Sequence, residues 1–376
     1  MGNCCKKKKI DDRLLDLDDP EKGIYNEDNP LGIKLKTDDF KKLKLIGKGS
    51  FGEVYLVQCK TNNKYYAMKV LDKQTIKSYN QEEHTKSERD LMAKIECPFI
   101  VGIKFAFQDS INLYLLTEFM QGGELFFHLF RERRFKNEKT RFYLTEIILA
   151  IDFLHKNKMM YRDLKPENVL IDSKGHIKIT DFGLSKILDK KNMKTYTICG
   201  TPEYLAPEIL LNKGYDKSVD FFSLGCLIYE MLSGKSPFKL PNNGILKVEN
   251  YLKIPDMPDY FSECEKDIIS KLLNSNPKLR LGFGENGIQN IKKHSYFNDV
   301  NWDDYRNKKI NPPFVPVIKN KFDLTNFDRQ FTLENVFDDE ESHNGINIKV
   351  DDDEYKNFTY ENREFREKLE KNEDFH

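Results

Sequence analysis

Short apolar runs mark the first part of the central region of the chain. Apolar and aromatic residues gather in residues 41–46, 54–57 and 65–70, and a glycine-rich segment separates the first two runs. Runs of this length, bounded by turn residues, are typical of β-strands. We therefore predict three strands, with the first two joined across residues 47–52.

Longer patterns follow these runs. Residues 82–95 have a helical composition, and Leu91 and Ile95 lie four residues apart, on one helix face. Further helical stretches are predicted in residues 125–156, 219–232 and 266–273. This order predicts an α+β fold, in which a small β-rich N-terminal lobe with one key helix precedes a larger α-helical lobe.

The pattern loosens at both ends of the chain. Residues 11–39 are acidic and are interrupted by Pro and Gly, as linkers are. From about residue 298 the chain becomes a polar extension with isolated aromatic residues. We predict three parts: an N-terminal segment (1–39), a folded domain (40–297) and a C-terminal extension (298–376).

Composition narrows the possible partners. The 376 residues include 39% hydrophobic residues, enough for a sizeable core in one large two-lobed domain or two ordinary ones. Charged residues reach 32%, but their signs cancel to a net charge of zero. Because phosphate backbones select net positive surfaces, this balance argues against nucleic acid as the main partner.

The seven cysteines show neither disulfide nor zinc-ligand spacing. We also find no signal-peptide pattern, and no apolar run approaches the roughly 18 residues that span a bilayer. We therefore expect a reducing, cytoplasmic environment.

The N-terminus carries candidate lipid attachment sites. Removal of the initiator methionine would expose Gly2 as a myristoylation acceptor, and Cys4 and Cys5 could be palmitoylated. A lysine run starts at Lys6, where myristoylation signals usually have Ser or Thr. Since one myristoyl chain binds membranes only marginally, a second chain or basic residues must help. We expect membrane association through this segment; a solvated basic tail is the alternative.

Residues 47–54 read Gly-Lys-Gly-Ser-Phe-Gly-Glu-Val. A GxGxxG pattern alone is a weak signal, because dinucleotide-binding loops share it, but those loops open a helix. Here a predicted strand follows. A glycine loop between antiparallel strands can cover triphosphate oxygens with its backbone N–H groups, and we favour this interpretation.

Lys69 lies in the third predicted strand, where its ammonium could pair with nucleotide phosphates while an acidic residue holds it. Glu88 on the following helix is the candidate partner, and Glu82 and Glu83 at the start of that helix are competitors.

Two further segments complete an ordered set. Residues 161–168 read Tyr-Arg-Asp-Leu-Lys-Pro-Glu-Asn, and residues 181–183 read Asp-Phe-Gly. In this order after the glycine loop and Lys69, they resemble a eukaryotic protein kinase. The resemblance covers about residues 40–361 and implies the bilobal protein kinase fold, with ATP and Mg²⁺ as cofactors.

The resemblance also implies roles for side chains. Asp163 would be the catalytic base, and Lys165 would neutralise charge on the transferred phosphoryl group. Asn168 and Asp181 would bind Mg²⁺ through hard oxygen ligands. The implied catalytic set is Asp163, Lys165, Lys69 and Glu88. The implied nucleotide-binding positions are Ile46, Gly47, Lys48, Gly49, Ser50, Phe51, Gly52, Val54, Ala67, Lys69, Glu118, Met120, Glu124, Leu170 and Thr180.

Residues 165–168 and 200–208 look like a Ser/Thr kinase and unlike a tyrosine kinase. The resemblance places Thr201 near Asp163 and Lys165. The same resemblance implies an apolar site for the substrate residue after the acceptor, lined by Ile198, Pro202 and Leu205.

Tyr161, in place of the commoner histidine, and the activation-segment sequence at residues 197–204 look like the AGC group. Within this group, residues 122–129 and 175–180 most resemble protein kinase B and serum- and ribosomal-kinase-like members. Thr197 would then be an activating phosphosite for an upstream kinase. Its phosphate could gather cations, for which the candidates are Arg162, Lys186 and His84. The alternative is one threonine among several in a polar loop.

The extension resembles the AGC tail in three places. Residues 313–316 resemble its proline motif, and residues 326–328 (Asn-Phe-Asp) resemble the element whose ring closes over the adenine site. Residues 355–360 resemble the hydrophobic motif, with Tyr355 in place of the usual phenylalanine. A phosphate on Thr359 could lock this motif beside the helix of Glu88.

The tail also departs from the family pattern. Protein kinase B relatives carry a Ser/Thr-Pro site between the last two elements, whereas residues 336–341 here read Val-Phe-Asp-Asp-Glu-Glu. We hypothesise that the carboxylates of Asp338, Asp339 and Glu340 stand in for that phosphate.

Glu124, Glu167 and Glu230 match positions that receive substrate arginines in basophilic AGC kinases. We therefore expect protein substrates with arginine two or three residues before Ser or Thr. The favoured function is an active Ser/Thr kinase in intracellular signalling. A scaffolding pseudokinase would require loss of Lys69, Asp163, Asn168 or Asp181, and all four are present. A metabolic nucleotide-binding protein is a more distant alternative.

Overall fold

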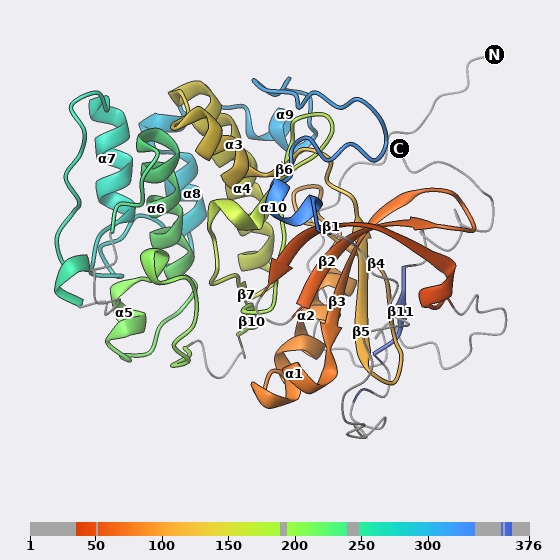
Figure 1. The fold of residues 1–376 in the computed structure, drawn as a ribbon. Coiled ribbons are helices and arrows are strands. Elements are labelled where there is room, and N and C mark those ends of the chain that lie inside the picture. Colours follow the sequence, from red (N-terminus) through yellow and green to blue (C-terminus); the bar gives the residue numbers. More distant parts are fainter. Residues whose placement is uncertain are drawn as a thin grey trace, which may run out of the picture.

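The computed structural model describes residues 35–49, 52–188, 194–238, 248–334, 355 and 358–362. It has the predicted two-lobed α+β architecture, with a β-rich N-terminal lobe and a helical C-terminal lobe (Figure 1). Ser50, Phe51, Gly2, Cys4, Cys5, Asp338, Asp339 and Glu340 lie outside the described residues.

One antiparallel sheet forms the N-terminal lobe, in the strand order β1-β2-β3-β5-β4-β11. Its strands are β1 (Phe40–Gly49), β2 (Gly52–Cys59), β3 (Tyr65–Asp72), β4 (Ile103–Gln108), β5 (Asn112–Glu118) and β11 (Tyr360–Glu361). The three strands predicted from the sequence are β1, β2 and β3. The strands β4 and β5 were not predicted. The last strand comes from the C-terminal extension and pairs with β4.

Two helices accompany this sheet. They are α1 (Lys73–Ser78) and α2 (Glu82–Lys94). The second matches the helix predicted over residues 82–95. Behind the sheet, Phe107 stacks between Phe40 and Tyr114, with ring centroids 5.9 and 4.6 Å away, in a small aromatic core.

Helices build the C-terminal lobe around α4 and α6. The helices are α3 (Leu125–Glu132), α4 (Asn137–Lys156), α5 (Pro207–Leu210), α6 (Val219–Ser233), α7 (Glu263–Leu272), α8 (Gly287–Lys292), α9 (Trp302–Arg306) and α10 (Arg329–Thr332). The helical stretches predicted in residues 125–156 are α3 and α4, and α7 begins before the predicted residue 266. The start of α7 is fixed by a capping box, in which Ser262 and Glu265 bond each other's backbone N–H groups.

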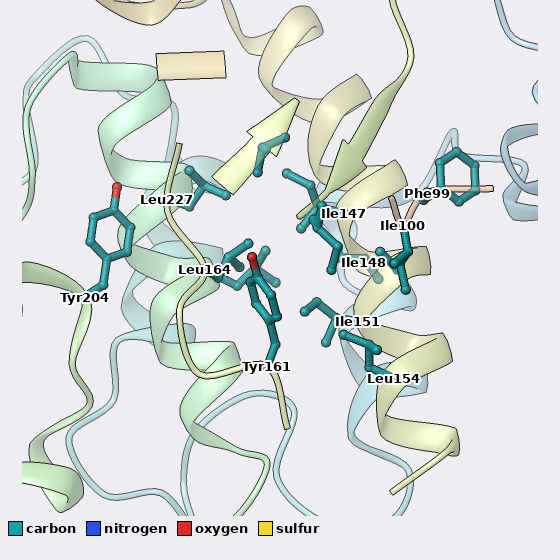
Figure 2. Packing of buried hydrophobic residues seen from close by; sticks show 14 of the residues in the cluster. Phe99, Ile100, Ile147, Ile148, Ile151, Leu154, Tyr161, Leu164, Tyr204 and Leu227 are labelled. Carbon is teal, nitrogen blue, oxygen red and sulfur yellow. The ribbon is translucent and has the colours of Figure 1, made fainter. Parts of the chain in front are cut away.

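Short strands position the loops of the C-terminal lobe. They are β6 (Gly123–Glu124), β8 (Val169–Ile171) and β9 (Ile177–Ile179) in one sheet, and β7 (Met159–Met160) and β10 (Lys186–Ile187) in another. Figure 2 shows Ile147, Ile148 and Ile151 of α4 pointing toward Tyr161 and Leu164, in a core that also contains Leu227 of α6. The segment that carries Asp163 is thus anchored by buried apolar residues on both sides.

Candidate active site

The glycine loop is the turn of the β1–β2 hairpin. Gly49 pairs with Gly52, and Gly47 pairs with Val54. A Cβ on Gly52 would lie 2.0 Å from the carbonyl oxygen of Val70, so only glycine fits there. Because β2 follows the loop directly, the alternative of a dinucleotide loop that opens a helix is wrong.

Lys69 lies on β3, and its side chain contacts residues from two other segments. Its Nζ lies 2.8 Å from Oε1 of Glu88 and 3.4 Å from Oδ1 of Asp181. Glu88 is therefore the partner, and the competitors Glu82 and Glu83 are not. This contact joins β3, α2 and the Asp-Phe-Gly segment at one point.

Charge and burial shift the pKa values of this trio. Burial alone would lower the pKa of Lys69, but the carboxylates of Asp181 and Glu88 raise it above its ordinary value. Burial raises the pKa of Glu88, against the effect of Lys69. The charge of Lys69 lowers the pKa of Asp181, which therefore stays ionised at neutral pH.

Hydrogen bonds fix the carboxylate of Asp163 from two sides. Oδ1 accepts from the Thr201 hydroxyl at 2.8 Å and from its backbone N–H at 3.2 Å. Oδ2 accepts from Nδ2 of Asn168 at 2.8 Å and lies 3.1 Å from Nζ of Lys165. Nζ of Lys165 also donates to the Thr201 hydroxyl at 2.9 Å. The structure thus brings together the four residues that the sequence predicted to meet here.

Buried Asp220 on α6 holds the backbone just before Asp163. Its carboxylate accepts from the backbone N–H groups of Tyr161 at 3.0 Å and Arg162 at 2.8 Å, and contacts Nε2 of His155 at 2.7 Å. Arg162 has a φ of +71°, a left-handed conformation that costs energy in a non-glycine residue. Sequence reasoning missed Asp220, although a carboxylate inside the apolar helix α6 is an available signal.

The Asp-Phe-Gly segment is fixed in a similar way. Asp181 has a φ of +58°, and the buried ring of Phe182 packs edge-on against Tyr161 at 5.4 Å. The hydroxyl of Tyr161 donates to the carbonyl of Thr180. The backbone N–H of Thr180 donates to the carbonyl of Asn168 at 3.0 Å, so the two predicted metal ligands are held in one local network.

The nucleotide positions of the sequence analysis come from both lobes. Ile46 and Val54 belong to the hairpin, Ala67 to β3, Leu170 to β8, and Met120 follows β5. Glu118, at the end of β5, is held by Nζ of Lys178 at 2.5 Å. Sequence reasoning did not single out Phe119, which stacks on Phe327 of the extension at 5.5 Å.

Three acidic side chains lie in or near the catalytic loop, which we define as residues 161–168. Burial, helped by the charges of Glu167 and Asp328, raises the pKa of Glu124 to about 7. Oε2 of Glu167 is buried and has no hydrogen-bond partner in the described structure. Glu230 accepts from the Tyr204 hydroxyl, and burial raises its pKa, with a further contribution from the charge of Glu167. The charge of Lys165 acts against this repulsion at Glu124 and Glu167, so the three carboxylates share one nearby cation.

The activation segment connects Arg162 with Thr197 through Tyr215. The Tyr215 hydroxyl donates to the Thr197 carbonyl at 2.6 Å and accepts from Nη1 of Arg162 at 3.1 Å. The side chain of Thr197 is exposed. Of the other expected cations, Lys186 donates to Thr195 at 2.9 Å and His84 contacts Gln81 at 2.7 Å. In these contacts, Lys186 and His84 are bonded to residues other than Thr197.

The apolar site for the residue after the acceptor is partly formed. Ile198 is 59% exposed, whereas Leu205 is buried beneath Gly200. Pro202 begins a short 3-10 helix, and its carbonyl accepts from the Tyr251 hydroxyl at 2.8 Å.

The C-terminal extension contacts both lobes. Phe314 packs against His128 at 4.9 Å, and Asn326 donates to the carbonyl of Gln121 at 3.2 Å. Tyr355 and Phe358 are buried. Their rings face Lys86 and Arg89 of α2 at 5.2 and 5.6 Å. The side chain of Thr359 is exposed.

Comparison with known proteins gives the class. The protein kinase domain family matches residues 40–297 of this chain. The chain therefore belongs to the protein kinase family.

Curated relatives narrow this class. Serine/threonine-protein kinase YPK2/YKR2 of Saccharomyces cerevisiae is 46% identical over 83% of this chain and 45% of its own length. Serine/threonine-protein kinase gad8 of Schizosaccharomyces pombe is 45% identical over 82% of this chain and 53% of its own length. Serine/threonine-protein kinase Sgk1-A of Xenopus laevis is 45% identical over 80% of this chain and 69% of its own length. The predicted resemblance to AGC-group kinases is confirmed, and the chain matches about half the length of the two yeast relatives.

Within the described part of the chain, no helix combines the length and the apolar character that crossing a bilayer requires.

Proposed function

We propose that this protein is an Mg-ATP-dependent protein serine/threonine kinase. The observation that carries the proposal is the meeting of Lys69, Glu88 and Asp181 at 2.8 and 3.4 Å, three residues far apart in the sequence. The kinases to which the chain is similar are named serine/threonine-protein kinases. The protein kinase family uses ATP and Mg²⁺.

The side chains present fit a magnesium nucleotide. Nδ2 of Asn168 donates to Asp163, which leaves its amide oxygen as an acceptor for a cation. Asp181 is ionised and 49% of its side chain is exposed. Among the described residues no cluster of three or more His, Cys, Asp or Glu could hold a metal by itself. One carboxylate and one amide suit Mg²⁺, which takes its other ligands from phosphates and water.

In this mechanism the protein mainly positions groups. Bound Mg-ATP supplies the phosphoryl group and the cation that neutralises its charge. Asp163, held by Thr201 and Asn168, orients the acceptor hydroxyl and receives its proton. Lys165 lies 3.1 Å from Asp163, close enough to stabilise charge on the group being transferred.

We propose that the substrates are proteins with arginine two or three residues before the acceptor. Glu124, Glu167 and Glu230 support this, since the unpaired, buried Oε2 of Glu167 needs a donor. Guanidinium groups bind carboxylates with two parallel hydrogen bonds. A peptide array in which replacing those arginines by alanine causes no loss would refute the preference.

Regulation by phosphorylation is a further part of the proposal. An upstream kinase would modify Thr197, next to the Arg162–Tyr215 link, and Thr359, next to buried Phe358. For the acidic segment, we propose that Asp338, Asp339 and Glu340 replace a phosphate. If their Asn and Gln variants keep both thermal stability and activity, this part is wrong.

The N-terminal segment is proposed to attach the protein to membranes. The support is the sequence alone: Gly2, Cys4, Cys5 and the following lysines. Intact mass measurement of protein from cells, compared with a Gly2→Ala variant, tests it. An unmodified Gly2 with no change in membrane fractionation would contradict it.

The decisive experiment is a radiolabelled-ATP assay with an arginine-containing peptide. We expect the wild type to transfer label and Asp181→Ala to lose transfer while remaining folded. If both fail to transfer label yet bind nucleotide, the protein is a pseudokinase scaffold.

A further inference from the structure

Thr332 is preceded by an arginine at the spacing that the proposed substrate preference requires. It follows Arg329 by three positions, in the segment Arg329-Gln330-Phe331-Thr332-Leu333. No other serine or threonine of the chain has an arginine two or three residues before it. Thr332 is therefore the one site in this chain that satisfies the proposed arginine preference.

Leu333 supports the same interpretation independently. Its side chain is 75% exposed at the end of α10, where packing gives no reason for a leucine. In the proposed function, the substrate residue directly after the acceptor is apolar and packs against Ile198, Pro202 and Leu205. Leu333 is that residue when Thr332 is the acceptor.

The structure shows how this segment can be released. The helix α10 has only four residues, and the Asp328 side chain caps it by accepting from the N–H of Gln330 at 2.9 Å. Arg329 is exposed and makes no ion pair with any described residue. Arg329, Gln330 and Leu333 are exposed, and Phe331 and Thr332 are half-buried. A single helical turn with so little burial opens at low free-energy cost, so residues 329–333 can extend as a peptide substrate does.

We propose that Thr332 is an autophosphorylation site, modified by a second copy of this kinase. This inference rests on the proposed function. The Thr332 Oγ1 forms a bond to the γ-phosphorus of ATP, and the bond from that phosphorus to the β–γ bridging oxygen breaks. ADP leaves with the electron pair, and the hydroxyl proton passes to Asp163 of the modifying copy and then to solvent.

The site lies next to the glycine loop. The helix α10 packs against β1 (Figure 1). Two residues after Thr332, Glu334 lies 2.9 Å from Nζ of Lys48, which is also 3.3 Å from Glu53. A phosphate on Thr332 would add up to two negative charges at the contact between the extension and the nucleotide cover.

The test uses two full-length copies that differ in mass through an affinity tag. The tagged copy carries Asp181→Asn and acts as substrate, and the untagged wild type acts as enzyme. After incubation with ATP, mass spectrometry maps phosphate on the tagged copy. An arginine-containing peptide in the same reaction reports whether the wild type is active.

We expect phosphate at Thr332 of the tagged copy. Arg329→Ala in that copy should lower the initial rate about tenfold, since a charge-assisted recognition bond is lost. Arg306→Ala is the matched control, because this arginine precedes no hydroxyl residue at the required spacing, and the rate should not change. Thr332→Val should abolish the signal at this position.

Two results would overturn the inference while leaving the proposed function intact. One is a phosphorylated peptide with no phosphate at Thr332 of the tagged copy. The other is an unchanged rate for Arg329→Ala. If the peptide itself stays unmodified, the proposed kinase activity fails, and the inference fails with it.

Discussion

Asp163 depends on neighbours that hold it by hydrogen bonds at both oxygens. Thr201 and Asn168 contact Oδ1 and Oδ2 at 2.8 Å, and Asp220 fixes the backbone before it. A carboxylate constrained in this way has lost its rotamer freedom before a substrate arrives. The arrangement therefore favours positioning of the acceptor hydroxyl as the main contribution of Asp163.

Asp163→Asn tests this role with almost unchanged shape. We expect kcat to fall about 10²- to 10⁴-fold, because the amide cannot accept the proton, with little change in the KM for ATP. Steady-state kinetics with the arginine-containing peptide measure both. Asp299→Asn, at an exposed position, is the control and should keep wild-type rates. A loss below tenfold for Asp163→Asn would contradict the assignment.

The raised pKa of Glu124 predicts that the KM for an arginine-containing substrate depends on pH. Burial, Glu167 and Asp328 raise the pKa of Glu124 to about 7, so it is protonated below this pH and ionised above it. An arginine substrate pairs with the ionised form. Its KM should therefore fall as pH rises from 6 to 8.

The control is a peptide with alanine in place of arginine, whose KM should lack this dependence. Glu124→Gln should flatten the profile for the arginine peptide. If the wild-type profile keeps its shape in this variant, another group titrates.

At the level of elements, the sequence predicted those helices and strands whose formation depends on residues close together in the chain. The hairpin β1–β2 and the helix α2 follow from apolar runs and glycines within a few residues. The start of α7 was placed late, because the Ser262 cap outweighs the weak apolar pattern of its first turn. The strands β4 and β5 were missed, and each contains at least three consecutive buried residues, which interrupt the alternation of a half-buried strand.

Contacts between distant segments were harder to predict. Motif order placed Lys69, Glu88 and Asp181 in one site, and the structure agrees. The contributions of Tyr215 and Asp220 arise from side chains that are brought to the catalytic loop by tertiary packing. The apolar neighbours of Asp220 in α6 mark it as a buried carboxylate, but they do not show which backbone groups it holds.

The contact between α10 and β1 gives a prediction at this scale. Glu334→Gln removes one carboxylate from Lys48, and an ion pair as exposed as this one contributes little because solvent screens it. We expect the KM for ATP to rise about 1.5- to 5-fold, because the glycine loop is held less firmly. The difference from wild type should shrink at high salt.

Glu285→Gln is the matched control, since this glutamate is exposed and far from β1 in the sequence. It should leave the KM for ATP unchanged. An equal effect of both variants would show a general charge effect and not a specific contact.

At the scale of the whole molecule, the C-terminal extension joins the two lobes. It contacts the helical lobe through Phe314, Phe119 at the end of β5 through Phe327, and α2 through Phe358. The same helix α2 carries Glu88, the partner of Lys69. Docking of the extension and formation of the Lys69–Glu88 pair should therefore be coupled.

Phe358→Ala tests the coupling, because it removes a fully buried ring from the face of α2. Burial of such a ring is worth about 3–5 kcal/mol, enough to release the end of the extension. We expect kcat to fall and thermal stability to decrease. Val317→Ala, at a position 77% exposed, is the control and should change neither.

A synthetic peptide of residues 353–362 separates docking from general damage. If the extension acts by occupying the face of α2, the peptide at high concentration should restore activity to Phe358→Ala. A peptide with the same substitution should not. Restored stability without restored activity would show that the extension stabilises the N-terminal lobe but does not set the position of Glu88.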